Sequence, residues 1–420
     1  MPPRTYRGLL AERRLVSQSA ETASSGVPWR SGLLYVILAS SLMGVMGVSL
    51  LSPVLPELRS VFDVTDAQVG LLITVYTLPG AVIAPFAGLA ADRFGRRRVL
   101  VPLLVTFGVA GAGIAFVTDF RFVLALRFLQ GIGASALVTL AVTIIGDAFE
   151  GNQRDALIGL NGSATSAGAA VYPLIGGALA AVRWNIPFLF FGIGILVGVF
   201  ALFVLEPAPG SDGETVRTYL GRLQAVARLP SALAVFLALF AAFFVFYGAV
   251  LTALPLLLSD QFGLNSSEIG PLLSAVAVAS AVVSSQYGRV GDWRAPEELV
   301  ALGFVAYGVS LLGVWLAPTP LVVGVSLLLF GVGFGILIPS IDTTVITLVS
   351  ADLRAGMMGL RTSVLRVGQT VGPLAFTAAA DTLFVSTAAG YRVLILLGGI
   401  TALAAGLGGY LLLRYHARFA

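Results

Sequence analysis

The sequence of 420 residues contains no cysteine, no lysine and a single histidine, His416. Without cysteine there can be no disulfide and no thiolate metal site, and one histidine near the end of the chain forms no cluster. The absence of lysine excludes a phosphate-binding loop of the Gly-x-x-x-x-Gly-Lys type. These absences argue against metal or nucleophile chemistry, so we expect no enzyme, no cofactor and no metal site.

Charged residues are scarce as well. They form 11% of the chain, whereas hydrophobic residues form 57% and the mean hydropathy is +0.95. Soluble domains carry about 25% charged residues, so most of this chain is expected to have lipid as its solvent. The apolar runs are continuous. They favour helices, which satisfy their own backbone hydrogen bonds in lipid, over a barrel, whose strands alternate apolar and polar residues. They predict twelve membrane-spanning helices, at 32–55, 68–90, 99–117, 121–146, 158–181, 186–205, 231–258, 269–288, 298–316, 320–346, 358–380 and 391–413.

The longest gap between these runs divides the chain in two. Residues 206–230 are rich in proline, glycine and charged residues, a composition typical of a linker. We therefore expect an all-α membrane protein with two bundles of six helices each. The expected units are an N-terminal cytoplasmic tail, the first bundle, a cytoplasmic linker, the second bundle and a C-terminal tail, at 1–30, 31–206, 207–230, 231–414 and 415–420.

Arginine is distributed unevenly between the predicted loops. Nineteen of the 25 arginines lie in or beside the two tails and the loops on the same side of the membrane as the tails. Four lie in the loops on the opposite side. Arginine is enriched on the cytoplasmic side of membrane proteins, so we expect both termini inside and a location in the cytoplasmic (inner) membrane. The net charge of +4 then reflects orientation and does not indicate a nucleic-acid partner.

The two halves are related by a constant offset of 200 residues. Asp92 corresponds to Asp292, and Pro173 corresponds to Pro373. The other matched pairs are Phe62 with Phe262, Gly70 with Gly270, Gly88 with Gly288, Gly131 with Gly331, Gly133 with Gly333, Arg154 with Arg354, Gly159 with Gly359 and Gly168 with Gly368. Two parallel repeats of this kind are related by a pseudo-twofold axis along the membrane normal. A binding site is expected where they meet, near mid-membrane.

A loop rich in glycine and arginine follows the second predicted helix. It reads Gly88-Leu-Ala-Ala-Asp92-Arg93-Phe-Gly95-Arg96-Arg97-Arg98. Its spacing resembles the signature loop of the major facilitator superfamily, and the chain resembles that family over essentially its whole length, the drug:proton antiporter branch above all. The resemblance implies that Asp92 helps to hold the halves together in the outward-open state. It also implies that the basic residues pair with an acid at the inner end of the fourth helix, for which Asp147 is the match.

The fourth predicted helix carries a charge inside an apolar run. Arg127, followed by Gln130, resembles the second motif of the same family. A charge at this depth needs a partner, water or a cavity. One interpretation is an arginine that extends to the outer headgroups. The other, implied by the resemblance, is a residue that shifts the proton on a neighbouring acid, so Arg127 and Gln130 are candidates for proton coupling.

Small residues and a proline recur along the fifth predicted helix, at Gly159, Gly168, Pro173, Gly176 and Gly177. Their counterparts in the second half are Gly368, Gly372 and Pro373. The pattern resembles the motif of the family's proton-coupled exporters, in which small residues allow close packing and a bend. Tyr172 departs from it, because the motif has glycine directly before the proline. Packing glycines are common in membrane proteins, so the motif alone does not establish export.

Few charges lie within the predicted spans. Asp342 and Arg366 have comparable depths in the tenth and eleventh helices, so we expect them to form an ion pair. The pair is either static or part of proton movement, and both interpretations remain open. No acid lies in the middle of the first, fourth, fifth or seventh span, which makes Asp342 the best candidate for a proton carrier.

The expected substrate cavity is apolar. By the family resemblance, the first, fourth, seventh and tenth helices face it, and they carry few hydrogen-bonding side chains. The candidate lining residues are Thr139, Phe243, Tyr247 and Phe330. Such a lining suits a small lipophilic solute better than a sugar or a dicarboxylate. The alternative is that the phenylalanines face lipid or neighbouring helices.

The pattern as a whole predicts a secondary active transporter that moves a small lipophilic solute by alternating access, as a proton-coupled exporter. Its expected partners are the solute, protons and the lipid bilayer, and we expect a monomer. An importer or facilitator of a metabolite on the same fold is one alternative. A membrane-embedded sensor or enzyme is another.

Overall fold

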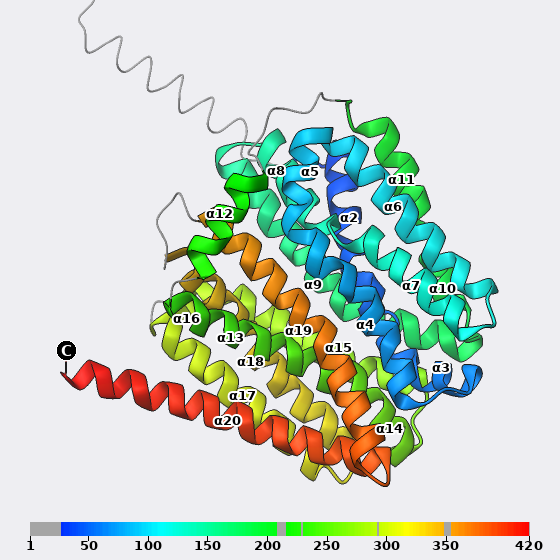
Figure 1. Ribbon diagram of the computed structural model, residues 1–420, viewed down its shortest axis with the longest axis vertical. Helices are drawn as coiled ribbons and strands as arrows, with labels where there is room; N and C mark the ends of the chain where they lie inside the picture. Colours follow the sequence, from blue (N-terminus) through cyan, green and yellow to red (C-terminus); the bar gives the residue numbers. More distant parts are fainter. Residues whose placement is uncertain (1–26, 208–215, 228–229, 292–293, 348–353, 420) are drawn as a thin grey trace, which may run out of the picture.

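The computed structural model describes residues 27–207, 216–227, 230–291, 294–347 and 354–419. Every regular element in these ranges is a helix, and the helices form two bundles side by side (Figure 1). The expected all-helical fold class is confirmed. The expected N-terminal tail lies outside the described residues except for its last four positions.

The first bundle contains six spans, several of them divided into shorter helices. The 3₁₀ turns at Ser52–Val54 and Ala84–Phe86 each contain a proline, which has no N–H to continue the α-helical hydrogen-bond ladder. The elements are α2 (Gly32–Ser49), η1 (Ser52–Val54), α3 (Leu55–Phe62), α4 (Asp66–Ile83), η2 (Ala84–Phe86), α5 (Ala87–Phe94), α6 (Arg96–Gly113), η3 (Ile114–Phe116), α7 (Phe120–Ala134), α8 (Leu137–Ala148), α9 (Gly151–Val182), α10 (Ile186–Phe190) and α11 (Ile193–Val204).

The second bundle repeats this order. Its seventh span contains a stretch of π-helix, η4, between two α-helices. The elements are α13 (Pro230–Val245), η4 (Phe246–Ala253), α14 (Leu254–Phe262), α15 (Ser266–Ser285), α16 (Tyr287–Gly291), α17 (Pro296–Leu316), α18 (Pro320–Thr347), α19 (Arg354–Leu383) and α20 (Thr387–Phe419). The expected linker contains one further helix, α12 (Val216–Ala227). The expected C-terminal tail is a continuation of α20 as far as Phe419.

Eleven helical segments of the described chain are long and apolar enough to cross a membrane. The remaining expected span, 358–380, is present as α19, a helix of 30 residues that carries Arg361 and Arg366. A helix of this length measures about 45 Å, more than the roughly 30 Å of a hydrocarbon core. α19 packs along α4 (Figure 1), and its polar residues Gln369, Thr370 and Thr377 are buried.

The repeat of 200 residues is visible in the backbone. The outer helices α3 and α14 both end in a left-handed residue, Asp63 with φ 49° and Gly263 with φ 67°. Each is followed two residues later by an N-cap that forms a capping box, Thr65 for α4 and Asn265 for α15. The same local chemistry therefore builds the same corner in both halves.

The halves meet along two equivalent pairs of helices, α4 with α19 and α9 with α15. We call the end of the molecule that carries Arg59 and Asp260 the outer end, and the end that carries 93–98 the inner end, following the expected orientation. At the outer end α3 lies against α14 (Figure 1). Toward the inner end, the glycines that have no atom within 4 Å of the place where a Cβ would stand include Gly88, Gly146, Gly159, Gly162 and Gly288. Close contacts between the halves that involve glycines therefore lie at the outer end and in the middle.

Candidate functional site

An arginine at the outer end joins the two halves. Arg59 on α3 donates from Nη1 to Asp66 Oδ1 at 2.7 Å, within its own half. It also donates to both oxygens of Asp260 on α14, from Nη2 at 2.5 Å and from Nη1 at 3.1 Å. We call these three residues the outer gate. A two-pronged arginine–carboxylate contact is the strongest geometry available to such a pair.

Two further hydrogen bonds close the outer end around the gate. The Ser52 hydroxyl donates to the backbone oxygen of Leu251 at 2.5 Å, and the Ser266 hydroxyl donates to Glu57 at 3.2 Å. Ser52 and Leu251 are close to equivalent positions of the repeat, so this bond lies near the axis that relates the halves. The gate was not predicted from the sequence, because Glu57 and Arg59 lie beyond the end of the first predicted span, 32–55.

Packing glycines bring the helices of the two halves into backbone contact. A Cβ on Gly177 of α9 would overlap the backbone oxygen of Ser266 on α15, and a Cβ on Gly270 would stand 2.5 Å from the backbone oxygen of Pro173. Other glycines of the expected motif pack within one half. Gly168 and Gly176 lie against α2 and the turn after it, and Gly368 and Gly372 lie against α13. Gly159 faces open space, so close packing does not explain it in this conformation.

The signature loop forms a cluster at the inner end. Gly95 has φ 90°, which places the loop in a conformation that favours glycine. Arg96 contacts Asp92 at 2.5 Å and Asp147 at 2.8 Å, so the loop and the end of α8 are joined through one guanidinium. No ion pair of Arg93 or Arg97 is present among the described residues. All three partners belong to the first half.

Arg127 is completely buried inside the first bundle, with 0% of its surface exposed. It donates to Gln130 Oε1 at 2.6 Å, to the backbone oxygen of Gly47 at 2.9 Å and to that of Leu72 at 3.2 Å. Its guanidinium carbon lies 4.7 Å from the centre of the Tyr76 ring. The interpretation of an arginine that reaches the outer headgroups is therefore wrong. Among the described residues no carboxylate contacts Arg127, so the geometry also offers no neighbouring acid whose proton it would shift.

The expected ion pair of Asp342 with Arg366 is wrong. Asp342 on α18 pairs with Arg361 on α19, at 2.5 Å to Nε and 2.8 Å to Nη2. Arg366 donates from Nη1 to Gln369 Oε1 at 3.1 Å instead. Both arginines lie within the expected span 358–380, but Arg361 is five residues closer than Arg366 to Arg354, the inner end of α19. Arg361 therefore lies within the helix, one turn closer to the inner end than Arg366, at the level of Asp342.

The cavity candidates fall into two groups. Phe330 on α18 is buried, and its ring stacks on Tyr307 with 3.9 Å between the centroids, so it belongs to the interior of the second bundle. Phe243 and Tyr247 are partly exposed, and so is Thr139 in the first half. We call Phe243, Phe246, Tyr247 and Phe334 the aromatic cluster, since their rings contact one another at 4.8 to 6.2 Å. It contains the start of η4, and π-helical turns occur often at functional sites.

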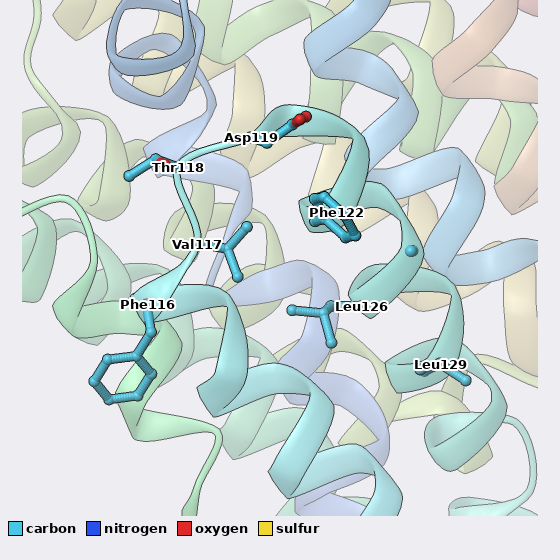
Figure 2. A pocket seen from close by; sticks show the side chains of 8 residues that line it. Phe116, Val117, Thr118, Asp119, Phe122, Leu126 and Leu129 are labelled. Atoms are coloured by element: carbon cyan, nitrogen blue, oxygen red, sulfur yellow. The ribbon is translucent and has the colours of Figure 1, made fainter.

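A surface hollow of about 690 Å³ is lined by residues of the first half alone (Figure 2). It is formed by the turn between η3 and α7 at the outer end of the first half, and its residues are Phe116, Val117, Thr118, Asp119, Phe122, Ala125, Leu126 and Leu129. Several of these side chains are exposed and apolar, as expected of a surface that faces lipid. The hollow does not lie between the halves, and it contains none of the expected site residues.

The described fold has two six-span bundles, a duplicated corner and a loop cluster on Arg96. A family model, "Major Facilitator Superfamily", matches residues 37–373 and 236–419. The chain belongs to the Major Facilitator Superfamily. This membership makes it a multi-pass membrane transporter and not an enzyme. It also confirms the family resemblance on which the expected fold depended.

The curated relatives of this superfamily member include named exporters and resistance proteins. It is 28% identical over 360 residues to the "Bacillibactin exporter" of Bacillus subtilis (strain 168). This match covers 82% of this chain and 89% of the relative. It is 28% identical over 355 residues to the "Tetracycline resistance protein, class G" of Vibrio anguillarum, over 81% and 89% of the two chains. Among solved structures, it is similar to an inward-facing, unoccupied bacterial homolog of the human lysosomal transporter Spinster. That likeness has a TM-score of 0.77 and 17% identity, and it covers 92% of this chain and 97% of the other. At this identity it shows the fold alone.

Proposed function

We propose that this superfamily member is a proton-coupled exporter that moves small lipophilic solutes by alternating access, as a monomer in the cytoplasmic membrane with both termini inside. The observation that carries the proposal is the asymmetry between the two ends. At the outer end, Arg59 and Asp260 join the halves by an ion pair. At the inner end, Gly159 and Gly162 of α9 face open space. Parallel repeats that rock about a central site pass through a state of this kind.

Direction and solute class are supported by two lines of argument. The named curated relatives are exporters or resistance proteins, and they match over most of their own length. The aromatic cluster on α13, η4 and α18 is an apolar surface of the second half that is partly exposed. An apolar, aromatic lining with few polar groups favours a lipophilic solute.

Protons are proposed as the coupling ion because carboxylates occupy the contacts that must change during transport. Asp260 joins the halves at the outer gate, and Asp66 is buried beside it. Asp342 remains a candidate as well, held by Arg361 near the inner end. Protonation of a gate carboxylate removes half of an ion pair and so weakens the closed outer end. A proton entering from outside is thereby linked to opening toward the outside.

The proposal is tested by efflux and by reconstitution. Cells that lack the protein should accumulate more of at least one dye from a panel of cationic, neutral and anionic lipophilic dyes than cells that contain it. Equal accumulation of every dye would refute export of lipophilic solutes. In proteoliposomes, transport should fall when an ionophore collapses the pH gradient. Transport that continues unchanged without the gradient would refute proton coupling while leaving export intact.

A further inference from the structure

Arg366 is a cation near mid-membrane whose expected partner is engaged elsewhere. It is the thirteenth of the 30 residues of α19, and Asp342 is occupied by Arg361. Its one hydrogen bond to a side chain joins Nη1 to the neutral Gln369, and its Nε is buried without a hydrogen-bond partner. Among the described residues no carboxylate contacts it. An arginine has five N–H donors, so most of its donor capacity is unused.

Arg366 lies where the two halves meet. The place of a Cβ on Gly80, in α4 of the first half, is 3.2 Å from both Cδ and Nε of Arg366. One turn farther toward the outer end, the Thr370 hydroxyl donates to the Thr77 hydroxyl at 3.1 Å. Thr74 donates to the backbone oxygen of Thr370 at 3.2 Å. The guanidinium therefore stands at the inner end of this line of polar contacts, and the side chain is partly exposed.

The aromatic cluster lies partly on α13 and η4, which pack against the helix that carries Arg366. The place of a Cβ on Gly368, two residues after Arg366 on α19, is 3.2 Å from Cβ of Phe243, and α19 also packs against η4, which carries Tyr247. The ring of Tyr247 is 6.2 Å from that of Phe243 and 5.7 Å from that of Phe246, between ring centres. Arg366 and the partly exposed aromatic cluster thus lie on helices of the second half that pack against each other. This is the layout that would receive a molecule with one anionic and one lipophilic end.

The charges around this region do not balance. Arg127 is a second buried cation without a carboxylate, but three neutral acceptors satisfy it. Asp342 lies one turn closer to the inner end than Arg366, and Arg361 neutralises it. An unpaired charge in the membrane interior is costly, and such residues commonly mark the path of a substrate. Arginine in particular presents a planar fork that matches carboxylate geometry.

We propose that Arg366 is a substrate-binding residue and that the transported solute is a lipophilic anion, with its carboxylate, phenolate or sulfonate on Arg366 and its apolar body on the aromatic cluster. The inference depends on the proposed transport function and narrows its substrate class. It also assigns Arg366 a binding role in place of the static or proton-carrying ion pair expected from the sequence.

The test compares two probes that differ in one charge. Dansylglycine carries a carboxylate, whereas dansylglycinamide has the same aromatic body and is neutral. Their binding to the purified protein in nanodiscs is measured by equilibrium dialysis, with empty nanodiscs subtracted. We expect the wild-type protein to bind the carboxylate at least about tenfold more tightly than the amide, the ratio that one charge-assisted hydrogen bond supports. Arg366→Gln should abolish that preference and leave the affinity for the amide unchanged, and Arg366→Lys should retain part of it.

Each result decides between outcomes. Unchanged amide binding shows that Arg366→Gln is folded, and Arg183→Gln, at an exposed outer-end arginine, should keep the full preference. Equal binding of both probes by the wild-type protein, binding of neither, or equal loss of both in Arg366→Gln would overturn the inference. Dye efflux that does not depend on charge would overturn it too, while the export function stands. Displacement of dansylglycine by added phosphatidylglycerol would assign the same anion site to a lipid headgroup, and its retention would assign the site to a free organic anion.

Discussion

Arg59 in the first half and Asp260 in the second half form a two-pronged ion pair, with 2.5 Å from Nη2 to Oδ1 and 3.1 Å from Nη1 to Oδ2. The same guanidinium also forms an ion pair with the buried Asp66. Asp66 thus orients Arg59 within its own half, and Asp260 can bind it only while the outer ends are together. The contact is a direct reporter of the closed outer end.

Loss of this contact should shift the protein toward conformations that are open at the outer end. An ion pair with this exposure contributes about 1 kcal/mol at most, so we expect Arg59→Gln to raise the open population roughly fivefold. The chain has no cysteine, so spin labels can be placed at Ser60→Cys and Gln261→Cys alone. Pulsed electron resonance should then show more of the longer distances. An unchanged distance distribution would show that the gate does not hold the outer end closed, and Arg121→Gln is the control.

A single methyl group at Gly177 should also open the outer end. A Cβ there would overlap the backbone oxygen of Ser266 across the interface, and the backbone cannot withdraw without separating α9 from α15. Gly162 lies on the same helix, and a Cβ there meets nothing within 4 Å. With the same spin labels, Gly177→Ala should lengthen the outer distances and Gly162→Ala should leave them unchanged. If both variants behave alike, helix propensity and not close packing explains the effect.

Removal of the buried Arg127 should destabilise the first bundle. Arg127→Gln leaves the backbone oxygens of Gly47 and Leu72 without their donor, at a cost of roughly 3 kcal/mol in the free energy of unfolding. Arg127→Lys retains the charge but cannot donate in three directions from one plane, so we expect an intermediate loss. Thermal unfolding followed by fluorescence measures both. Full stability in Arg127→Gln would mean that water replaces the arginine at this position.

Asp342 and Arg361 should behave as a pair. Asp342→Asn leaves Arg361 with an unmatched charge in a partly buried site, and we expect a loss of about 1–2 kcal/mol. The double variant Asp342→Asn with Arg361→Gln removes both charges and should recover at least half of that loss in a thermal unfolding assay. A transport assay with the double variant distinguishes a structural role of Asp342 from a role in proton coupling. A double variant that is stable and still driven by the pH gradient would remove Asp342 from the list of proton carriers.

Local features depend on neighbouring residues, so they can be read from the sequence. The left-handed corners at Asp63 and Gly263 and the capping boxes that follow were not predicted, but a few side chains on either side set them. The signature loop is similar, since Asp92 and Arg96 are four residues apart on the chain. Asp147 was also found as its partner, through the family motif and not through spacing alone.

Partners across the interface were not predicted in the same way. Arg59 and Asp260 are about 200 residues apart, and their contact depends on how far the two bundles have turned toward each other. The error at Asp342 has a simpler cause. Depth read from a hydropathy pattern is uncertain by several residues, and one turn of α19 was enough to exchange Arg366 for Arg361.

The sequence by itself determined that this chain spans a membrane as two repeated bundles of one family, because scarce charges, continuous apolar runs and a constant offset are properties of composition and order. Only the tertiary structure decided which charges are matched. A charge in the membrane interior is stabilised by the atoms within about 4 Å of it, and those atoms come from helices far apart in the chain. Arg127 therefore proved to be satisfied by neutral groups, and Arg366 proved to stand at the interface with no carboxylate of the described chain in contact with it.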